Sequence, residues 1–216
     1  VMGNIENNTR RLLEAGSQAH YFLCDITDRE QVVRLRDFVI EKYGEIDVLV
    51  NNAGAFQNAK AEEMEFDDWR RVISVNLDGN FNMSQIFGRE MISRSKGGSI
   101  IFVSSKSGFT VDVPQHHIAY NTSKAGINMM AKCLAVEWAQ YGIRANCIAP
   151  GNIRTDGNQQ KIDDRHPWID AWLSMNPMRR LGDIEELGNA AIYLASDASS
   201  YVTGETILID GGYNAL

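Results

Sequence analysis

The sequence predicts one α/β domain in which a doubly wound parallel sheet is covered by helices on both faces. Short apolar runs rich in β-branched residues recur along the 216 residues, and several lack the in–out alternation of a half-exposed strand. Helical patterns separate these runs, and strand–helix–strand crossovers build parallel sheets. No repeat or linker divides the chain, so we expect residues 1–216 to form a single domain.

The composition excludes several classes of protein. A net charge of −7 is opposite to the basic surface expected for nucleic-acid binding. No apolar run reaches the ~18–20 residues that a membrane span needs. Cys24, Cys133 and Cys147 lack metal-ligand spacing, and we interpret all three as buried free thiols in a reducing compartment. We therefore expect a cytoplasmic protein with no metal site.

The first half of the chain alternates strand and helix patterns. Thr27 and Glu30 fit a capping box that opens a helix, and Gly44 stands where that helix should stop. Asp67 and Asp68 open a second helix that runs toward residue 91. The strands expected over the whole chain are residues 21–26, 46–51, 99–104, 143–149 and 206–209.

The second half continues the alternation but contains one irregular segment. We expect a third helix over residues 120–140 and a fourth over residues 183–194. Residues 154–180 are rich in polar side chains and also contain Trp168 and Trp172. A segment of this length between a strand and a helix often forms a lid or a binding loop, so we expect a substrate loop there.

The residues that directly follow the strands predict a ligand site, because ligands bind outside the carboxyl ends of parallel strands. Asp25 follows the first run and could accept a hydrogen bond from an exocyclic amine. Gly54 and Gly151 follow two other runs and permit close approach of the backbone to a flat ligand. The alternative for each glycine is an ordinary turn.

Tyr120 and Lys124 lie four residues apart in a helical pattern, so both side chains should share one helix face. A nearby ammonium favours the phenolate and should lower the pKa of Tyr120, making it a candidate acid or base. Ser105 follows a central strand and could donate to a substrate oxygen. Asn76 is an awkward residue inside a helix, and a kink there could hold a water for a proton relay. The alternative is that Tyr120 and Lys124 are only surface neighbours.

Six short motifs together resemble the short-chain dehydrogenase/reductase family, in its order and near its spacing. They are NNAG at 51–54, VNLDG at 75–79, VSS at 103–105, YNTSK at 120–124, PGNIRT at 150–155 and IDGG at 209–212. The resemblance covers essentially the whole chain. It implies a single Rossmann-type domain, a nicotinamide cofactor and hydride transfer between that cofactor and a secondary alcohol or ketone.

The resemblance also implies roles for individual residues. The catalytic group is Asn76, Ser105, Tyr120 and Lys124, with Ser107 as a possible substitute for Ser105 because the loop before Tyr120 is about two residues longer than in the family pattern. Lys124 would lower the pKa of Tyr120 and hold the nicotinamide ribose. The remaining implied cofactor contacts are Asp25, Ile26, Asn51, Ala53, Gly54, Pro150, Gly151, Ile153 and Thr155.

One expected motif is missing. The family begins with a strand and a glycine-rich turn that cradles the pyrophosphate, and the sequence contains no such fingerprint. We expect Val1 and Met2 to end the second strand, with ~35–45 residues absent before them. The cofactor is then NADP or NAD, and the absence of an aspartate near Asn4, with Arg10 and Arg11 further along, favours NADP.

The substrate is expected to be a polyol, a ketose or a related sugar. The stretch at 114–124 and the C-terminal tail most resemble the sorbose reductase, mannitol 2-dehydrogenase and xylulose reductase branch. The residues expected to contact the substrate are Ser107, Gln115, His116, Asn152 and Trp168. Alternatives are a 3-oxoacyl-carrier-protein reductase and a dinucleotide-binding scaffold without turnover. We expect a homo-oligomer, a tetramer before a dimer, whose only other partner is a small molecule.

Overall fold

The computed structural model describes residues 2–216, and the side chains of residues 2–4, including Asn4, lie outside the described part. Within it, four strands form one parallel sheet in the order β1-β2-β3-β4. They are β1 (Val48–Asn51), β2 (Gly98–Val103), β3 (Ile143–Pro150) and β4 (Thr206–Ile209). These four correspond to predicted strands, and their carboxyl ends lie at one edge of the sheet.

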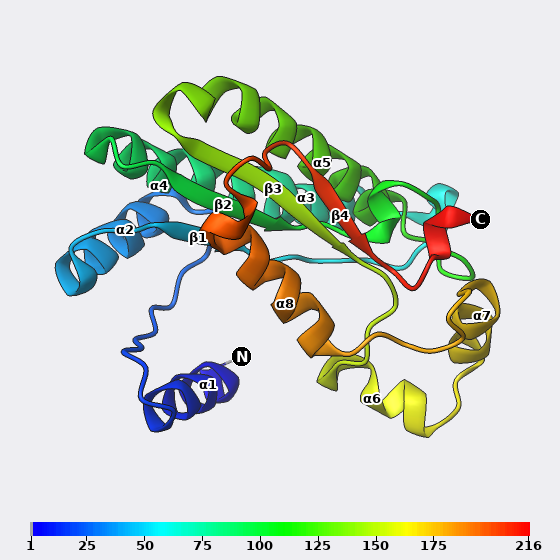
Figure 1. The fold of residues 1–216 in the computed structure, drawn as a ribbon. Helices are drawn as coiled ribbons and strands as arrows, with labels where there is room; N and C mark the ends of the chain where they lie inside the picture. The colour runs from blue at the N-terminus through cyan, green and yellow to red at the C-terminus, as the bar shows by residue number, and fades with distance from the viewer. Residues whose placement is uncertain (1) are drawn as a thin grey trace.

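Helices cover both faces of this sheet, which confirms the doubly wound architecture (Figure 1). On one face lie α2 (Arg29–Tyr43), α4 (Asn80–Arg94) and α5 (Ile118–Trp138), and on the other lies α8 (Ile184–Ala195). Ile100 packs in the larger core cluster, whereas its neighbour Ile101 packs in a second cluster with Leu194 of α8. Successive residues of β2 thus enter opposite cores, as a strand buried on both faces requires.

The helix ends follow local chemistry with one correction. Asp28, not Thr27, caps α2, because its carboxylate accepts from the backbone N–H groups of Glu30 and Gln31. Gly44 ends α2 in the left-handed conformation, with φ of 78°. The second predicted helix is α3 (Phe66–Ile73), a π-helical turn (Ser74–Gly79) and α4 in unbroken succession. Short 3-10 turns occupy Ala61–Glu63, Lys106–Gly108, Ala139–Tyr141, Asp197–Ser199 and Tyr213–Ala215.

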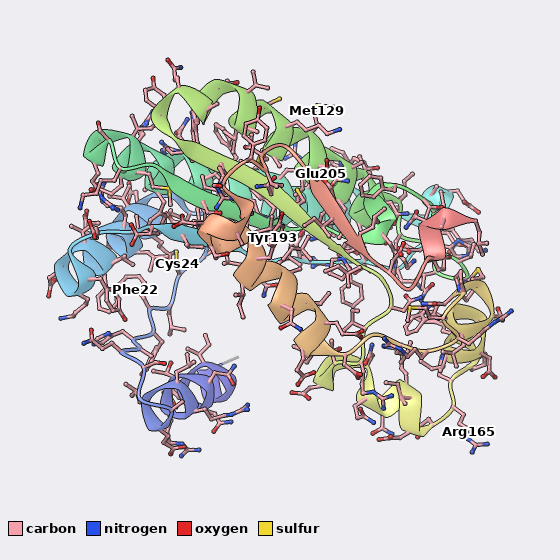
Figure 2. The ribbon with its side chains drawn as sticks, viewed as in Figure 1. Phe22, Cys24, Met129, Arg165, Tyr193 and Glu205 are labelled. Atoms are coloured by element: carbon pink, nitrogen blue, oxygen red, sulfur yellow. The ribbon has the colours of Figure 1, made fainter. Side chains whose placement is uncertain are left out.

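The N-terminal expectations are wrong in two places. Met2 belongs to helix α1 (Met2–Glu14) and not to the end of a strand, and α1 lies apart from the rest of the fold in Figure 1. Residues 21–26 are not a strand, because no described strand pairs with them. Phe22 and Cys24 lie on this stretch (Figure 2), and the Phe22 ring packs 5.2 Å from that of Phe38 in α2.

The segment 154–180 contains two short helices, α6 (Asp156–Asp163) and α7 (Pro167–Met175), beyond the carboxyl edge of the sheet (Figure 1). Arg165, labelled in Figure 2, joins them. Cys147 is buried as expected, but Cys133 is exposed on α5. Among the helices of the described residues, none combines the length and apolarity needed to cross a bilayer.

Candidate active site

The carboxyl edge of the sheet brings Ser105, Tyr120 and Lys124 together. Ser105 follows β2 and is 7% exposed, while the first turns of α5 carry Tyr120 and Lys124. Lys124 Nζ donates to the carbonyl oxygen of Val103 at 2.7 Å and lies 5.4 Å from the centroid of the Tyr120 ring. The two side chains therefore share one face of α5, as their four-residue spacing predicts.

Asn76 lies in the π-helical turn and is fully buried. Its Oδ1 accepts from the backbone N–H of Ala55 at 2.7 Å, and its Nδ2 donates to the Ala55 carbonyl at 2.9 Å and to Ser123 Oγ at 2.8 Å. A Cβ added at Gly54 would lie 3.4 Å from Asn76 Oδ1 and 3.7 Å from Lys124 Nζ. Asn76 thus ties the loop after β1 to α5 beside the lysine. The irregular turn that the sequence predicts is present, and the relay water stays a prediction.

The protonation of the pair differs from the sequence-based expectation. Burial raises the pKa of Tyr120, the hydrogen bond with Ser105 lowers it, and the charge of Asp112 raises it further. Burial also lowers the pKa of Lys124 from 10.5 to about 8. The expected lowering of the Tyr120 pKa by Lys124 is therefore wrong for the protein without cofactor, because loss of solvent outweighs the neighbouring ammonium.

A buried polar cluster continues from Ser105 along the loop before α5. Ser105 Oγ donates to Ser107 Oγ at 2.9 Å, and Ser107 Oγ donates to the two carboxylate oxygens of Asp112 at 2.9 and 2.8 Å. Lys106 Nζ donates to Asp112 Oδ1 at 2.6 Å, and His117 Nδ1 lies 3.3 Å from Oδ2. Burial disfavours the Asp112 carboxylate, but the hydrogen bond from His117 and the charge and hydrogen bond of Lys106 outweigh it and lower its pKa to about 2.

The sequence did not single out Lys106 or His117. Both lie in an irregular loop, where no periodicity shows which side chains turn inward. Ser105, rather than Ser107, lies close enough to the Tyr120 phenol to lower its pKa, while the hydroxyl of Ser107 is bound to Asp112. The geometry therefore favours Ser105 over Ser107 as the catalytic serine.

A cavity of about 600 Å³ opens next to Ser105 and Tyr120. Ser107, Gln115, Asn152 and Trp168 line it as expected for substrate contacts. His116 does not: its side chain is exposed, and the bound groups are its backbone N–H, which donates to Asn58 Oδ1 at 2.9 Å, and its carbonyl, which accepts from the Ala59 N–H at 3.0 Å. The imidazole of His117, at the N-cap of α5, lines the cavity instead. The other polar and aromatic lining residues are Asn58, Lys106, Asp112, His117, Asn158, Lys161 and Trp172.

The lid segment closes one side of this cavity. When the Gln115 amide is oriented to satisfy its neighbours, its oxygen accepts from the Trp172 indole N–H at 2.8 Å. The Trp168 and Trp172 rings lie 6.4 Å apart. This contact joins α7 to the loop that precedes α5.

A second cavity of about 270 Å³ lies beside the first and is the candidate nicotinamide site. Gly54, Lys124, Pro150 and Gly151 line it. In the described residues, Asn51 Oδ1 and Asn152 Nδ2 are buried without a hydrogen-bond partner, which leaves an acceptor and a donor at this edge of the sheet. These groups fit a ligand with a carboxamide and ribose hydroxyls.

The other implied cofactor residues have clear structural contacts. Asp25 Oδ1 accepts from the backbone N–H and hydroxyl of Thr27 at 2.9 and 2.8 Å, and Ile26 packs where a Cβ at Gly79 would stand. The Ala53 carbonyl accepts from Asn80, Ile153 bridges to Gly182, and Thr155 caps α6. Their cofactor roles stay predictions.

The sequence of this chain is similar to a family model and to several characterised enzymes. A family model described as enoyl-(acyl carrier protein) reductase matches residues 2–214. A galactitol 2-dehydrogenase of Cereibacter sphaeroides, which forms L-tagatose, is 39% identical over 191 residues, covering 88% of this chain and 74% of the relative. A 3-oxoacyl-(acyl carrier protein) reductase of Thermotoga maritima is 42% identical over 191 residues, covering 88% and 75%.

A solved structure agrees with these relatives. The gluconate 5-dehydrogenase from Burkholderia cenocepacia, in complex with NADP and tartrate, superimposes with a TM-score of 0.90 at 36% identity, over 97% of this chain and 81% of that one. Fold and site together define an α/β oxidoreductase. The chain belongs to the short-chain dehydrogenase/reductase family.

Proposed function

We propose that this chain transfers a hydride between a nicotinamide dinucleotide, NADP before NAD, and a polyol or its ketose. The observation that carries the proposal is the meeting of Ser105, Tyr120 and Lys124 at one cavity, next to a larger cavity of about 600 Å³ that Ser105 and Tyr120 also line. The NADP bound to the gluconate 5-dehydrogenase supports the choice of cofactor. The galactitol 2-dehydrogenase supports the choice of substrate.

The chain's own residues suit the nicotinamide half of the cofactor. Lys124 Nζ has three N–H bonds, and the acceptor it finds among the described residues is Val103, so it can also donate to ribose hydroxyls. Gly54 carries no side chain beside Lys124 Nζ, where a Cβ would lie 3.7 Å away, which leaves room for a ribose. When bound, the nicotinamide ring supplies or accepts the hydride at its C4 atom.

The substrate oxygen is held and protonated by two side chains. Ser105 and Tyr120 lie within hydrogen-bonding distance of each other, so one oxygen can bind both hydroxyls. In ketone reduction the Tyr120 hydroxyl gives its proton to that oxygen, and in alcohol oxidation the phenolate accepts it. Asn76 holds the loop after β1 in place beside Lys124, where a relay to solvent would begin.

The shape and chemistry of the larger cavity favour a polyhydroxy substrate. Gln115, Asn152 and His117 present hydrogen-bonding groups to it, and Trp168 presents an apolar face on which a sugar could stack. In the described residues, His117 Nε2 is buried without a partner, which a substrate hydroxyl would supply.

An assay with NADH and NADPH against fructose, sorbose, xylulose and an acyl ketone tests the proposal. We expect oxidation of the reduced cofactor with at least one ketose, at a higher kcat/KM than with the acyl ketone. Turnover of the acyl ketone alone would replace the proposal with a carrier-protein reductase. Cofactor binding without turnover of any compound would leave a dinucleotide-binding scaffold.

The carrier-protein reductase is the second candidate because the Thermotoga maritima relative is 42% identical. Carrier proteins are acidic and bind basic surfaces. The net charge of −7 opposes such docking.

The raised pKa of Tyr120 gives a prediction for pH dependence. Since burial raises the Tyr120 pKa above 10.0, the phenol stays protonated at neutral pH, and the cofactor-free protein should form this phenolate only above pH 10. Oxidised cofactor carries a cationic ring and should lower the pKa. The phenolate absorbance of the wild type minus that of Tyr120→Phe, followed against pH, measures the Tyr120 pKa without and with oxidised cofactor. Ionisation below pH 9 without cofactor would contradict the prediction.

We also propose a cytoplasmic homo-oligomer, a tetramer before a dimer. Large apolar side chains are exposed on neighbouring helices, with Phe81 on α4 and Met129 and Val136 on α5. Exposed apolar patches of this kind mark protein interfaces. The three free cysteines fit a reducing compartment. The molar mass from light scattering gives the number of subunits in solution.

A further inference from the structure

The buried cluster beside Ser105 contains a charged pair that the proposed chemistry does not use. Lys106 is 4% exposed, Ser107 5% and Asp112 7%. Lys106 Nζ donates to Asp112 at 2.6 Å and lies 4.2 Å from the centroid of the Tyr213 ring. Buried ion pairs are weak stabilisers, because desolvation offsets most of their attraction. Stability is therefore a poor explanation for this pair in the wall of the cavity.

The hydrogen bonds of Asp112 show that it does not bind substrate directly. Its Oδ1 accepts from Lys106 and Ser107, and its Oδ2 accepts from Ser107 and lies near His117 Nδ1. A carboxylate offers about four acceptor positions. Three protein groups face these positions, with the single Ser107 hydrogen shared between both oxygens, so little of the carboxylate is left for a substrate hydroxyl.

We propose that Asp112 is a positioning residue for Ser105 and Tyr120, acting through Ser107 and held by Lys106 and His117. This inference rests on the proposed function. It assigns the loop between β2 and α5 a task in the reaction besides forming the cavity wall.

Asp112 does not contact Ser105 directly, and the direction of the hydrogen bonds explains how it acts on Ser105 through Ser107. The single hydroxyl hydrogen of Ser107 is held by the carboxylate, so Ser107 offers only lone pairs to the Ser105 hydroxyl. The backbone N–H of Ser107 donates to Ser105 Oγ at 3.1 Å. The Ser107 N–H thus fixes the position of Ser105 Oγ before substrate binds, which removes an ordering cost, and the Ser105 hydrogen leaves Ser107 Oγ when it turns to the substrate oxygen.

The charge of Asp112 also acts on Tyr120. The charged groups around the phenol are Lys124 on α5 and the Lys106–Asp112 pair on the preceding loop. The Asp112 charge raises the pKa of Tyr120. It therefore helps to keep the phenol protonated, which is the form that gives a proton to a ketone.

Ser107→Ala tests the anchoring with little risk to folding, because the Lys106–Asp112 pair remains. We expect kcat/KM for the ketose to fall about tenfold, with unchanged cofactor affinity, an unchanged thermal midpoint and an unchanged Tyr120 titration. Ser93→Ala is the matched control, because Ser93 is exposed on α4 and donates only to Glu90. Full activity of Ser107→Ala would overturn the inference.

Asp112→Asn tests the charge. We expect a rate loss like that of Ser107→Ala and, in addition, a Tyr120 titration shifted toward lower pH, because the charge that raises its pKa is gone. If this variant does not fold, Lys106→Gln/Asp112→Asn tests the rate loss alone, because removing both charges leaves the net charge near Tyr120 unchanged. A Tyr120 titration equal to that of the wild type would overturn the inference. A wild type that turns over no ketose would instead defeat the proposed function, and the titration would still test the role of Asp112.

Discussion

Tyr120→Phe is expected to lower kcat by about a thousandfold while nicotinamide binding stays nearly unchanged. The substitution removes one oxygen and keeps the ring, so the apolar packing of α5 against the sheet is preserved. It removes the proton donor that lies beside Ser105 in the candidate site. Single-turnover rates and cofactor fluorescence titrations measure the two quantities separately.

Tyr193→Phe is the matched control for this experiment. Tyr193 lies on α8, on the opposite face of the sheet (Figure 2), and loses the same oxygen. We expect its kcat to equal that of the wild type. If Tyr120→Phe kept more than a few per cent of the wild-type rate, another group would be the acid and the proposed mechanism would fail.

Lys124→Met is expected to reduce both chemistry and cofactor binding, because Lys124 has two tasks in the proposed site. The side chain is 4% exposed, and methionine fills nearly the same volume without a charge. Loss of an ionic hydrogen bond to the ribose should weaken cofactor binding about tenfold or more. Loss of the ammonium beside Tyr120 should lower kcat by about a hundredfold.

Lys132→Met provides the control on the same helix, since Lys132 is exposed and two turns further along α5. It should bind cofactor and turn over substrate like the wild type. Normal cofactor affinity in Lys124→Met would show that Lys124 does not hold the ribose. An unchanged kcat would show that the phenol does not depend on its charge.

The sequence predicted the sheet well where the strand signal is strong and a neighbour is present. The patterns at 143–149 and 206–209 became β3 and β4 almost without change. The equally apolar stretch 21–26 formed no strand, because backbone pairing requires a second strand and none lies beside it among residues 2–216. Local propensity therefore identified candidates, and neighbouring backbone selected among them.

In the candidate site, too, local sequence indicated some residues and the tertiary fold decided others. The spacing of Tyr120 and Lys124 determines that they share a face of α5, and the motif after β2 places Ser105 at the edge of the sheet. The inward turn of His117 instead of His116 depends on how an irregular loop meets the start of α5. The hydrogen bonds that join Asp112 to Lys106 and Ser107 could not be predicted, because these residues become partners only when that loop is folded.

By itself, the sequence determined most of the order of strands and helices, which follows from periodicity along the chain, and its motifs indicated the candidate catalytic side chains through their resemblance to a family. Tertiary structure alone decided the protonation of those side chains. Burial raises the pKa of Tyr120 and lowers that of Lys124, and loss of solvent is a property of the whole fold that no local spacing of residues contains.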